Sequence, residues 1–298
     1  MEIIKIKSNF DDLEIEIAIS KPLEKAKGIV QISHGMSENK ERYFDFMNFL
    51  SENGYICVIN DHRGHGNSVK KESDFGYFYT EDCNAIVEDL HQITKYIKNE
   101  YKDLDIFLFS HSMGTLVARN YLKKYDNEIK KVILCGPPTK NNLAPFGIKI
   151  AKFLKVFQGE EIRSNFLNAL VFGNYNKGYT KKNEWICSNS EVVDEYNNGN
   201  KTGFIFTING FINLFEMMES VYIKEDWNIQ NKDLKIFVIA GSDDPVIQNK
   251  AKFNELAEFL KEIGYEDIKS KLYENKRHEL LNEIGKGEVY QNILEFLN

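Results

Sequence analysis

The chain has 298 residues, of which 42% are hydrophobic and 28% charged, the balance of a folded globular protein and not of a disordered one. With 38 basic and 45 acidic residues its formal net charge is −7, and no block of Lys and Arg interrupts the acidic background, which argues against a nucleic-acid partner. Residues 1–10 lack the apolar core of a secretory signal, and no run of about 18 apolar residues predicts a membrane span. The four cysteines lie far apart, so we expect reduced thiols and a cytoplasmic protein.

Eight short apolar runs predict β-strands, at residues 3–7, 13–20, 28–33, 56–60, 106–109, 131–135, 235–240 and 268–273. Five stretches with helical periodicity alternate with them, at residues 42–53, 81–100, 112–124, 250–263 and 285–297. This alternation predicts an α/β fold with a mostly parallel, twisted sheet of about eight strands and helices on its faces. The first two runs flank the turn-like segment Asn9–Asp12, which favours an antiparallel hairpin at one edge.

Residues 137–228 break this rhythm, because they contain helical patterns and no clear strand. In the sharpest of three patterns one helix face carries Phe204, Ile208, Phe211, Phe215, Met218 and Tyr222. We therefore predict an α/β core formed by residues 1–136 and 229–298, with a helical cap inserted at 137–228.

The pentapeptide Ser110-His111-Ser112-Met113-Gly114 stands between a predicted strand and a predicted helix. A serine at such a sharp strand-to-helix turn is typical of a nucleophile elbow, which needs small residues two positions before and after the serine. Gly114 meets this requirement, and Ser110 replaces the usual glycine with another small residue. We expect Ser112 to be a nucleophile.

A serine hydroxyl needs a base to take its proton and an acid to orient that base. In this type of fold the chain order is Ser, then Asp or Glu, then His. His278 is the only histidine that follows Ser112, and it comes directly after the last predicted strand. For the acid we favour Asp244 over Asp243, because Asp244 precedes Pro245 and is biased toward an extended conformation.

An acyl-transfer intermediate also needs main-chain donors for its oxyanion. We expect one at Met113, directly after the nucleophile, and the other at Met36, in a loop where Gly35 lets the chain turn back toward Ser112. The segment Asp61–Ser68 holds two histidines but lacks the spacing of a hydrolytic zinc site. We interpret it as a structural loop, ordered by Asp61 and Arg63, and expect neither metal nor cofactor.

Together these segments resemble the α/β-hydrolase superfamily, and more narrowly its monoacylglycerol lipase and lysophospholipase branch, also described as serine aminopeptidase-like hydrolases. The matching pieces follow the family's order, at residues 34–38, 61–68, 110–114, 241–246 and 277–283. Within the cap, Trp185–Ser188 and Val193–Tyr196 are also similar to the family, but Asn197-Asn198-Gly199 stands where the family often has Asp-Pro. The resemblance implies an α/β-hydrolase fold and a serine carboxylic-ester hydrolase that cleaves monoacylglycerol, lysophospholipid or related acyl esters through an acyl-enzyme.

The cap sequence bears on the substrate and the partners. We expect Gly35, Phe211, Leu214, Phe215 and Met218 to contact an acyl ester or lipid substrate, since Met and Phe make an adaptable apolar lining. A second apolar stripe, at Phe146, Ile150, Phe153, Leu154 and Phe157, also suits an acyl chain or a transient contact with a membrane surface.

Two other functions stay open on the sequence alone. The first is an aminopeptidase-like amidase, in which Glu160, Glu161 or Glu184 of the cap would hold a free amine. The second is a non-catalytic binding module on the same scaffold, although no member of the predicted triad is missing. The sequence indicates no particular oligomeric state.

Overall fold

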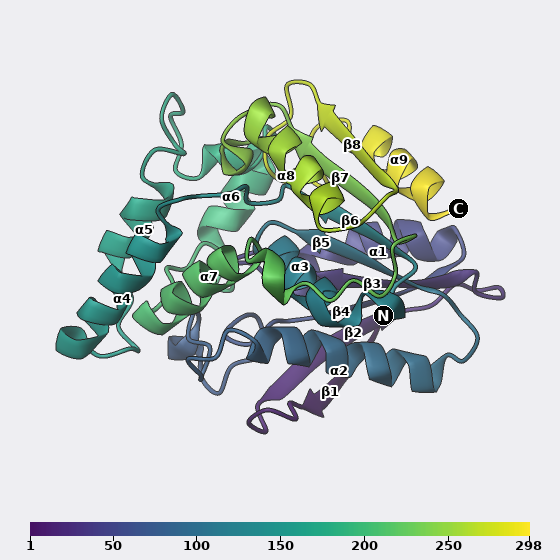
Figure 1. Ribbon diagram of the computed structural model, residues 1–298, viewed down its shortest axis with the longest axis horizontal. Helices are drawn as coiled ribbons and strands as arrows, with labels where there is room; N and C mark the ends of the chain where they lie inside the picture. The colour runs from purple at the N-terminus through teal and green to yellow at the C-terminus, as the bar shows by residue number, and fades with distance from the viewer.

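In the computed structural model, which describes residues 1–298, eight strands form one sheet in the order β1-β2-β4-β3-β5-β6-β7-β8 (Figure 1). Their bounds are β1 Glu2–Lys7, β2 Glu14–Ser20, β3 Gly28–Ser33, β4 Tyr55–Asn60, β5 Ile106–His111, β6 Lys131–Cys135, β7 Lys235–Gly241 and β8 Ile268–Tyr273. The β1–β2 and β2–β4 pairs are antiparallel, and all the other neighbours are parallel. The eight predicted strands, the mostly parallel sheet and the edge hairpin are therefore confirmed.

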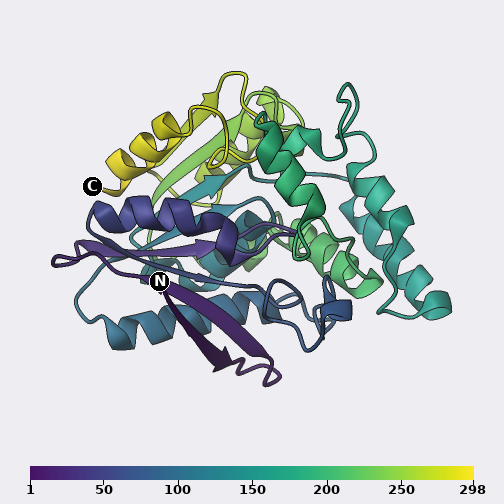
Figure 2. The same ribbon diagram turned by 180° about the vertical axis from the view of Figure 1, so that it is seen from behind.

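Helices cover both faces of the sheet (Figures 1 and 2). Their bounds are α1 Phe44–Glu52, α2 Ala85–Glu100, α3 Met113–Tyr125, α8 Lys250–Glu262 and α9 Gly287–Leu297. Side chains of α1 and α9 pack in one buried cluster, and those of α2, α3 and α8 pack in a second, larger one. Because side chains alternate along a strand, successive residues of β5 enter different clusters, Leu108 one and Phe109 the other.

Four helices lie between β6 and β7, where the sequence indicated three helical patterns (Figure 1). They are α4 Ala144–Gln158, α5 Asn165–Phe172, α6 Ser190–Asn198 and α7 Ile208–Ser220. Gly147 of α4 packs closely on α7, since a Cβ atom there would lie 3.1 Å from the ring of Phe215. Thr207 caps α7 by accepting a hydrogen bond from the Gly210 amide, so Phe204 lies outside the helix that the sequence pattern assigned to it. No helix of the protein is both long and apolar enough to cross a membrane.

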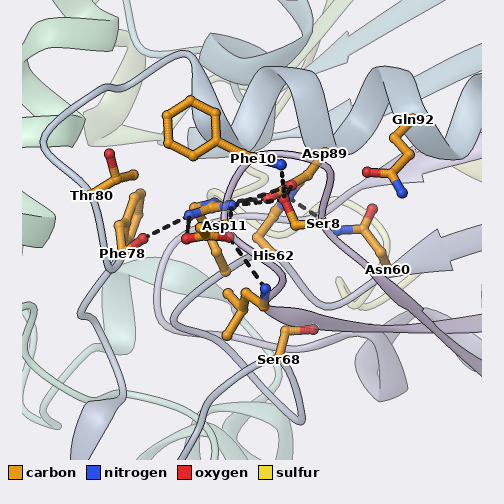
Figure 3. Close-up of polar contacts among 12 residues, drawn as sticks. Ser8, Phe10, Asp11, Asn60, His62, Ser68, Phe78, Thr80, Asp89 and Gln92 are labelled. Atoms are coloured by element: carbon orange, nitrogen blue, oxygen red, sulfur yellow. Dashed lines mark hydrogen bonds and ion pairs between the residues drawn. The ribbon is translucent and has the colours of Figure 1, made fainter.

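Buried ion pairs hold the loop Asp61–Ser68 in place (Figure 3). The fully buried Arg63 guanidinium donates to Asp89 at 2.8 Å, to Asp11 at 3.0 Å and to the Phe78 carbonyl at 2.9 Å. It therefore ties this loop to α2 and to the β1–β2 turn. Asp61 binds the Lys40 ammonium at 2.7 Å and accepts from the Lys40 and Asn67 amides, each at 2.8 Å. The structural role expected for Asp61 and Arg63 matches these contacts.

Candidate active site

Ser112 occupies a strained turn between β5 and α3. Its φ and ψ are 52° and −121°, a region that residues other than glycine rarely adopt. The turn is held because the Ser112 amide donates to the Cys135 carbonyl at 2.9 Å. A side chain at Gly114 would collide with the Ser33 carbonyl, and Ser110 fits because its hydroxyl donates to the Ile133 carbonyl at 2.9 Å. The strand, turn and helix expected of a nucleophile elbow are thus all present.

His278 and Asp244 form a buried pair. The Nδ1 atom of His278 lies 2.9 Å from Oδ2 of Asp244, whose other oxygen accepts from the Val246 amide at 2.8 Å. Asp243 is exposed and contacts the Ser242 hydroxyl instead, so the structure places Asp244 and not Asp243 beside the imidazole. Gly136 follows β6 with φ +57°, and a Cβ atom there would lie 3.0 Å from His278 Nδ1. The sequence reasoning did not single out Gly136, although a glycine directly after a central parallel strand is a signal for such close packing.

The two main-chain donors expected for an oxyanion lie beside Ser112. Met113 is the first residue of α3, where amides have no partner within the helix. The Met36 amide donates to no other main-chain or side-chain group. Gly35 allows the close approach of its loop, because a Cβ atom there would lie 3.1 Å from Cβ of Ser112.

One cavity of about 150 Å³ contains Ser112, His278, Met36 and Met113 in its wall. Of its 26 lining residues 14 are hydrophobic, and most of these come from the segment between β6 and β7. They include Val171, Phe172, Tyr175, Trp185, Leu214 and Met218. The site is therefore a mostly apolar chamber that contains the candidate nucleophile and base, a form that suits an acyl chain.

The predicted substrate contacts are only partly found in this chamber. Gly35, Leu214 and Met218 line it, whereas Phe211 and Phe215 do not. Both phenylalanines are buried in the core, where Phe215 packs against α4, so their assignment as lining residues is corrected. All four residues belong to one broad apolar side of α7, where Leu214 and Met218 meet the chamber and Phe211 and Phe215 meet the core.

The second apolar stripe, which runs from Phe146 to Phe157, does not lie against the chamber where an acyl chain would bind. None of its five residues lines the chamber, and Phe146, Phe153 and Phe157 of α4 are 59%, 63% and 72% exposed. The wall is formed instead by α5 and the loop after it, through Val171, Phe172 and Tyr175. The eight-residue α5 lacks a long periodic pattern, which is why the sequence did not indicate it.

Three buried histidines beside the site are held neutral. His34 Nε2 accepts from the His62 amide at 2.9 Å, and His65 Nε2 accepts from the Ser37 amide at 3.2 Å. A ring nitrogen that accepts a hydrogen bond carries no proton. Burial lowers the pKa of His34 and His62, and it lowers the pKa of His65 to about 3.

Residues 24–285 match the protein family described as serine aminopeptidase, S33. The chain belongs to this family. Among curated relatives, the monoacylglycerol lipase of Mycolicibacterium smegmatis is 28% identical over 130 residues, which are 43% of this chain and 45% of that protein. The monoglyceride lipase of Mus musculus is 28% identical over 140 residues, 45% of each chain. The chain thus spans less than half the length of these curated relatives.

Solved structures share the fold over the whole chain. A thermostable carboxyl esterase from Bacillus coagulans superposes with a TM-score of 0.92 at 26% identity, covering 100% of this chain and 97% of that one. The monoglyceride lipase of Saccharomyces cerevisiae has the same fold, with a TM-score of 0.77 at 21% identity over 100% and 94% of the two chains. The protein is an esterase- or lipase-like α/β hydrolase.

Because His34, His62 and His65 are neutral in the folded protein, we expect the protein to lose stability in mild acid. The unfolded chain binds a proton at His65 near pH 6.5, whereas the folded protein binds it only near pH 3, so stability rises with pH between these values. Protonation of His65 in the unfolded chain should by itself lower the free energy of unfolding by about 2 kcal/mol between pH 7 and pH 5. His34 and His62 act in the same direction, and His111, whose pKa is raised, acts in the opposite one.

Urea unfolding at pH 7, 6 and 5 measures this loss. A His65→Gln variant should show a shallower dependence on pH than the wild type. An unfolding free energy that is constant or rises from pH 7 to pH 5 would contradict the assignment of neutral histidines.

Proposed function

We propose that this protein hydrolyses carboxylic esters by an acyl-enzyme mechanism in which Ser112 is the nucleophile. His278 takes the Ser112 proton, Asp244 orients the imidazole, and the Met36 and Met113 amides bind the oxyanion. The leaving alcohol receives the proton from His278, and a water activated by His278 then releases the acyl group. The main support is that His278, buried and 2.9 Å from Asp244, lines the same apolar chamber as the strained Ser112.

The substrate we propose is an acyl ester with a medium or long chain, such as a monoacylglycerol or a lysophospholipid. The apolar lining formed by Val171, Phe172, Leu214 and Met218 supports it, because an acyl chain gains about 0.8 kcal/mol for each methylene that leaves water. The named activities of the relatives, monoacylglycerol lipase and monoglyceride lipase, are consistent with this class.

An amidase that binds a free amine is less well supported. Glu160, Glu161 and Glu184 of the cap do not line the chamber, and Glu160 is engaged by Lys155 and by the Tyr77 hydroxyl. The carboxylates that do line it, Glu38 and Glu279, already bind Arg42. No unpaired carboxylate is therefore left in the chamber wall to hold an ammonium group. A binding module without activity would have no need for the strained Ser112.

Activity against a panel of esters tests this function. Wild-type kcat/KM should rise with acyl length, and esters should be cleaved at least about 100-fold faster than aminoacyl arylamides. Ser112→Ala should remove activity, a loss of about 10⁴-fold or more, with urea unfolding unchanged. Full esterase activity in that variant, or a preference for arylamides, would refute the proposal.

We also propose that the outer face of α4 and α5 touches a lipid surface transiently. The connection from Leu143 to Leu170 exposes large apolar side chains with exposed fractions from 48% to 78%, namely Leu143, Phe146, Phe153, Val156, Phe157, Ile162, Phe166 and Leu170. Residues 137–182 contain eight basic and two acidic residues, a net +6 within a chain of net −7. Lys152, Lys155 and Lys181 are paired with acidic residues outside this segment, and the remaining cations favour an anionic surface.

Vesicle binding measures this contact. A Phe153→Ser/Phe157→Ser double variant should bind vesicles containing phosphatidylglycerol several-fold more weakly than the wild type, because two exposed phenyl rings no longer insert. Hydrolysis of a short soluble ester should be unchanged, since neither residue lines the chamber. Leu23→Ser is the matched control, because Leu23 is fully exposed but lies outside the cap. Equal weakening by Leu23→Ser, or none by the double variant, would contradict a specific cap contact.

A further inference from the structure

Four ionisable side chains, Arg42, Glu279, Glu38 and His111, lie together beside the candidate base. Arg42 binds both oxygens of Glu279, at 2.6 and 2.7 Å, and binds Glu38 at 2.9 Å. The other oxygen of Glu38 lies 3.1 Å from Nδ1 of His111 and accepts from the Tyr43 hydroxyl at 2.8 Å. The carboxylates and the imidazole are buried, and the side chain of Arg42 is only 14% exposed.

His111 completes the charge balance of this cluster. Its Nδ1 lies 3.1 Å from the Glu38 carboxylate and its Nε2 lies 3.4 Å from the His278 carbonyl, so both nitrogens point at acceptors, which favours the protonated imidazole. Burial acts to lower the pKa of His111, but the hydrogen bond and the charge of Glu38 outweigh it and raise the pKa. The pKa of Glu38 is correspondingly lowered, because His111 and Arg42 more than offset its burial. A protonated His111 and Arg42 together balance the charges of Glu38 and Glu279.

Each member of the cluster is attached to a different part of the site. Glu38 accepts from the Gly35 amide at 2.5 Å and so fixes the loop that carries the Met36 donor. His111 directly precedes Ser112, and Glu279 directly follows His278. From the cap, the ring of Tyr196 lies 5.2 Å from the Arg42 guanidinium and also lines the chamber.

We propose that Arg42 is a positioning residue that holds the oxyanion loop and the His278 loop in register through Glu38 and Glu279. The planar guanidinium is suited to this because its fork of donors binds both oxygens of Glu279 and still reaches Glu38 in fixed directions, whereas a lysine ammonium is a point charge without bidentate geometry. A displacement of about 1 Å at a reacting group can cost about 100-fold in rate, so a tether between these loops acts on turnover and not on substrate affinity. This inference deepens the proposed ester hydrolysis and rests on it.

Glu279→Gln tests the tether, with Glu283→Gln as its matched control. Both carboxylates are buried, 5% and 2% exposed, and both lie in the loop that carries His278. Glu283 accepts from the Arg277 and Ser188 amides, each at 3.0 Å, and does not contact Arg42. We expect Glu279→Gln to lower kcat about 10-fold or more with KM changed less than about 2-fold, whereas Glu283→Gln keeps more than half of kcat. Phosphonylation of Ser112 by a small fluorophosphonate should slow in parallel with kcat.

Arg42→Lys is a second test that does not depend on the folding of Glu279→Gln. Lysine retains the positive charge but loses the bidentate fork that fixes the direction of Glu279, so we expect a folded variant with kcat lowered about 10-fold and KM nearly unchanged. Equal kcat in Glu279→Gln and Glu283→Gln, unchanged kcat in Arg42→Lys, or a loss that appears only in KM would each overturn the tether. A wild type that hydrolyses no ester would refute the proposed function. An active wild type whose Arg42 and Glu279 variants are equally active would refute only the tether.

Discussion

Parallel pairing of β3, β5, β6, β7 and β8 brings the carboxyl ends of these strands to one edge of the sheet, and the candidate site is built on those ends. Gly35 and Met36 follow β3, Ser112 follows β5, and His278 lies a few residues after β8. Residues that are more than 160 positions apart in the chain therefore meet without any long excursion of the loops. This is the position at which open α/β sheets place their ligands.

The site also requires main-chain segments to approach their neighbours closely at the carboxyl edge of the sheet. Gly114 lets α3 start against β3, Gly35 brings its loop to Ser112, and Gly136 leaves room for the His278 ring. Each of these positions would place a Cβ atom within about 3 Å of a neighbour. The strain at Ser112 is maintained because the surrounding sheet and helix fix both ends of the turn.

Buried histidines divide into two kinds around this site, and their partners explain the division. His34 and His65 accept from main-chain amides and remain neutral, whereas His111 faces a carboxylate and a carbonyl. The neutral histidines connect the loop that carries Met36 with the loop that carries Arg63. His111 belongs to the Arg42 cluster, which joins the loops that carry the nucleophile, the base and the oxyanion donors.

The sequence predicted the sheet and the elbow because their signals are local: apolar runs, a turn at 9–12, and small residues around Ser112. His278 was found by elimination, and its functional role stays a prediction. The sequence could not separate Leu214 and Met218 from Phe211 and Phe215, because all four share one apolar side of α7, part of which packs in the core and part of which lines the chamber. Nor could it pair Arg42 with Glu279, which lies 237 residues away and meets it only through the fold.

A crystal structure of the protein after reaction with an alkyl fluorophosphonate would show whether Ser112 is the nucleophile of this chamber. We expect phosphorus bonded to Ser112 Oγ, with the phosphoryl oxygen about 3 Å from the Met36 and Met113 amides and the alkyl chain against α5 and α7. Phosphorus on another residue, or a phosphoryl oxygen turned away from both amides, would contradict this expectation.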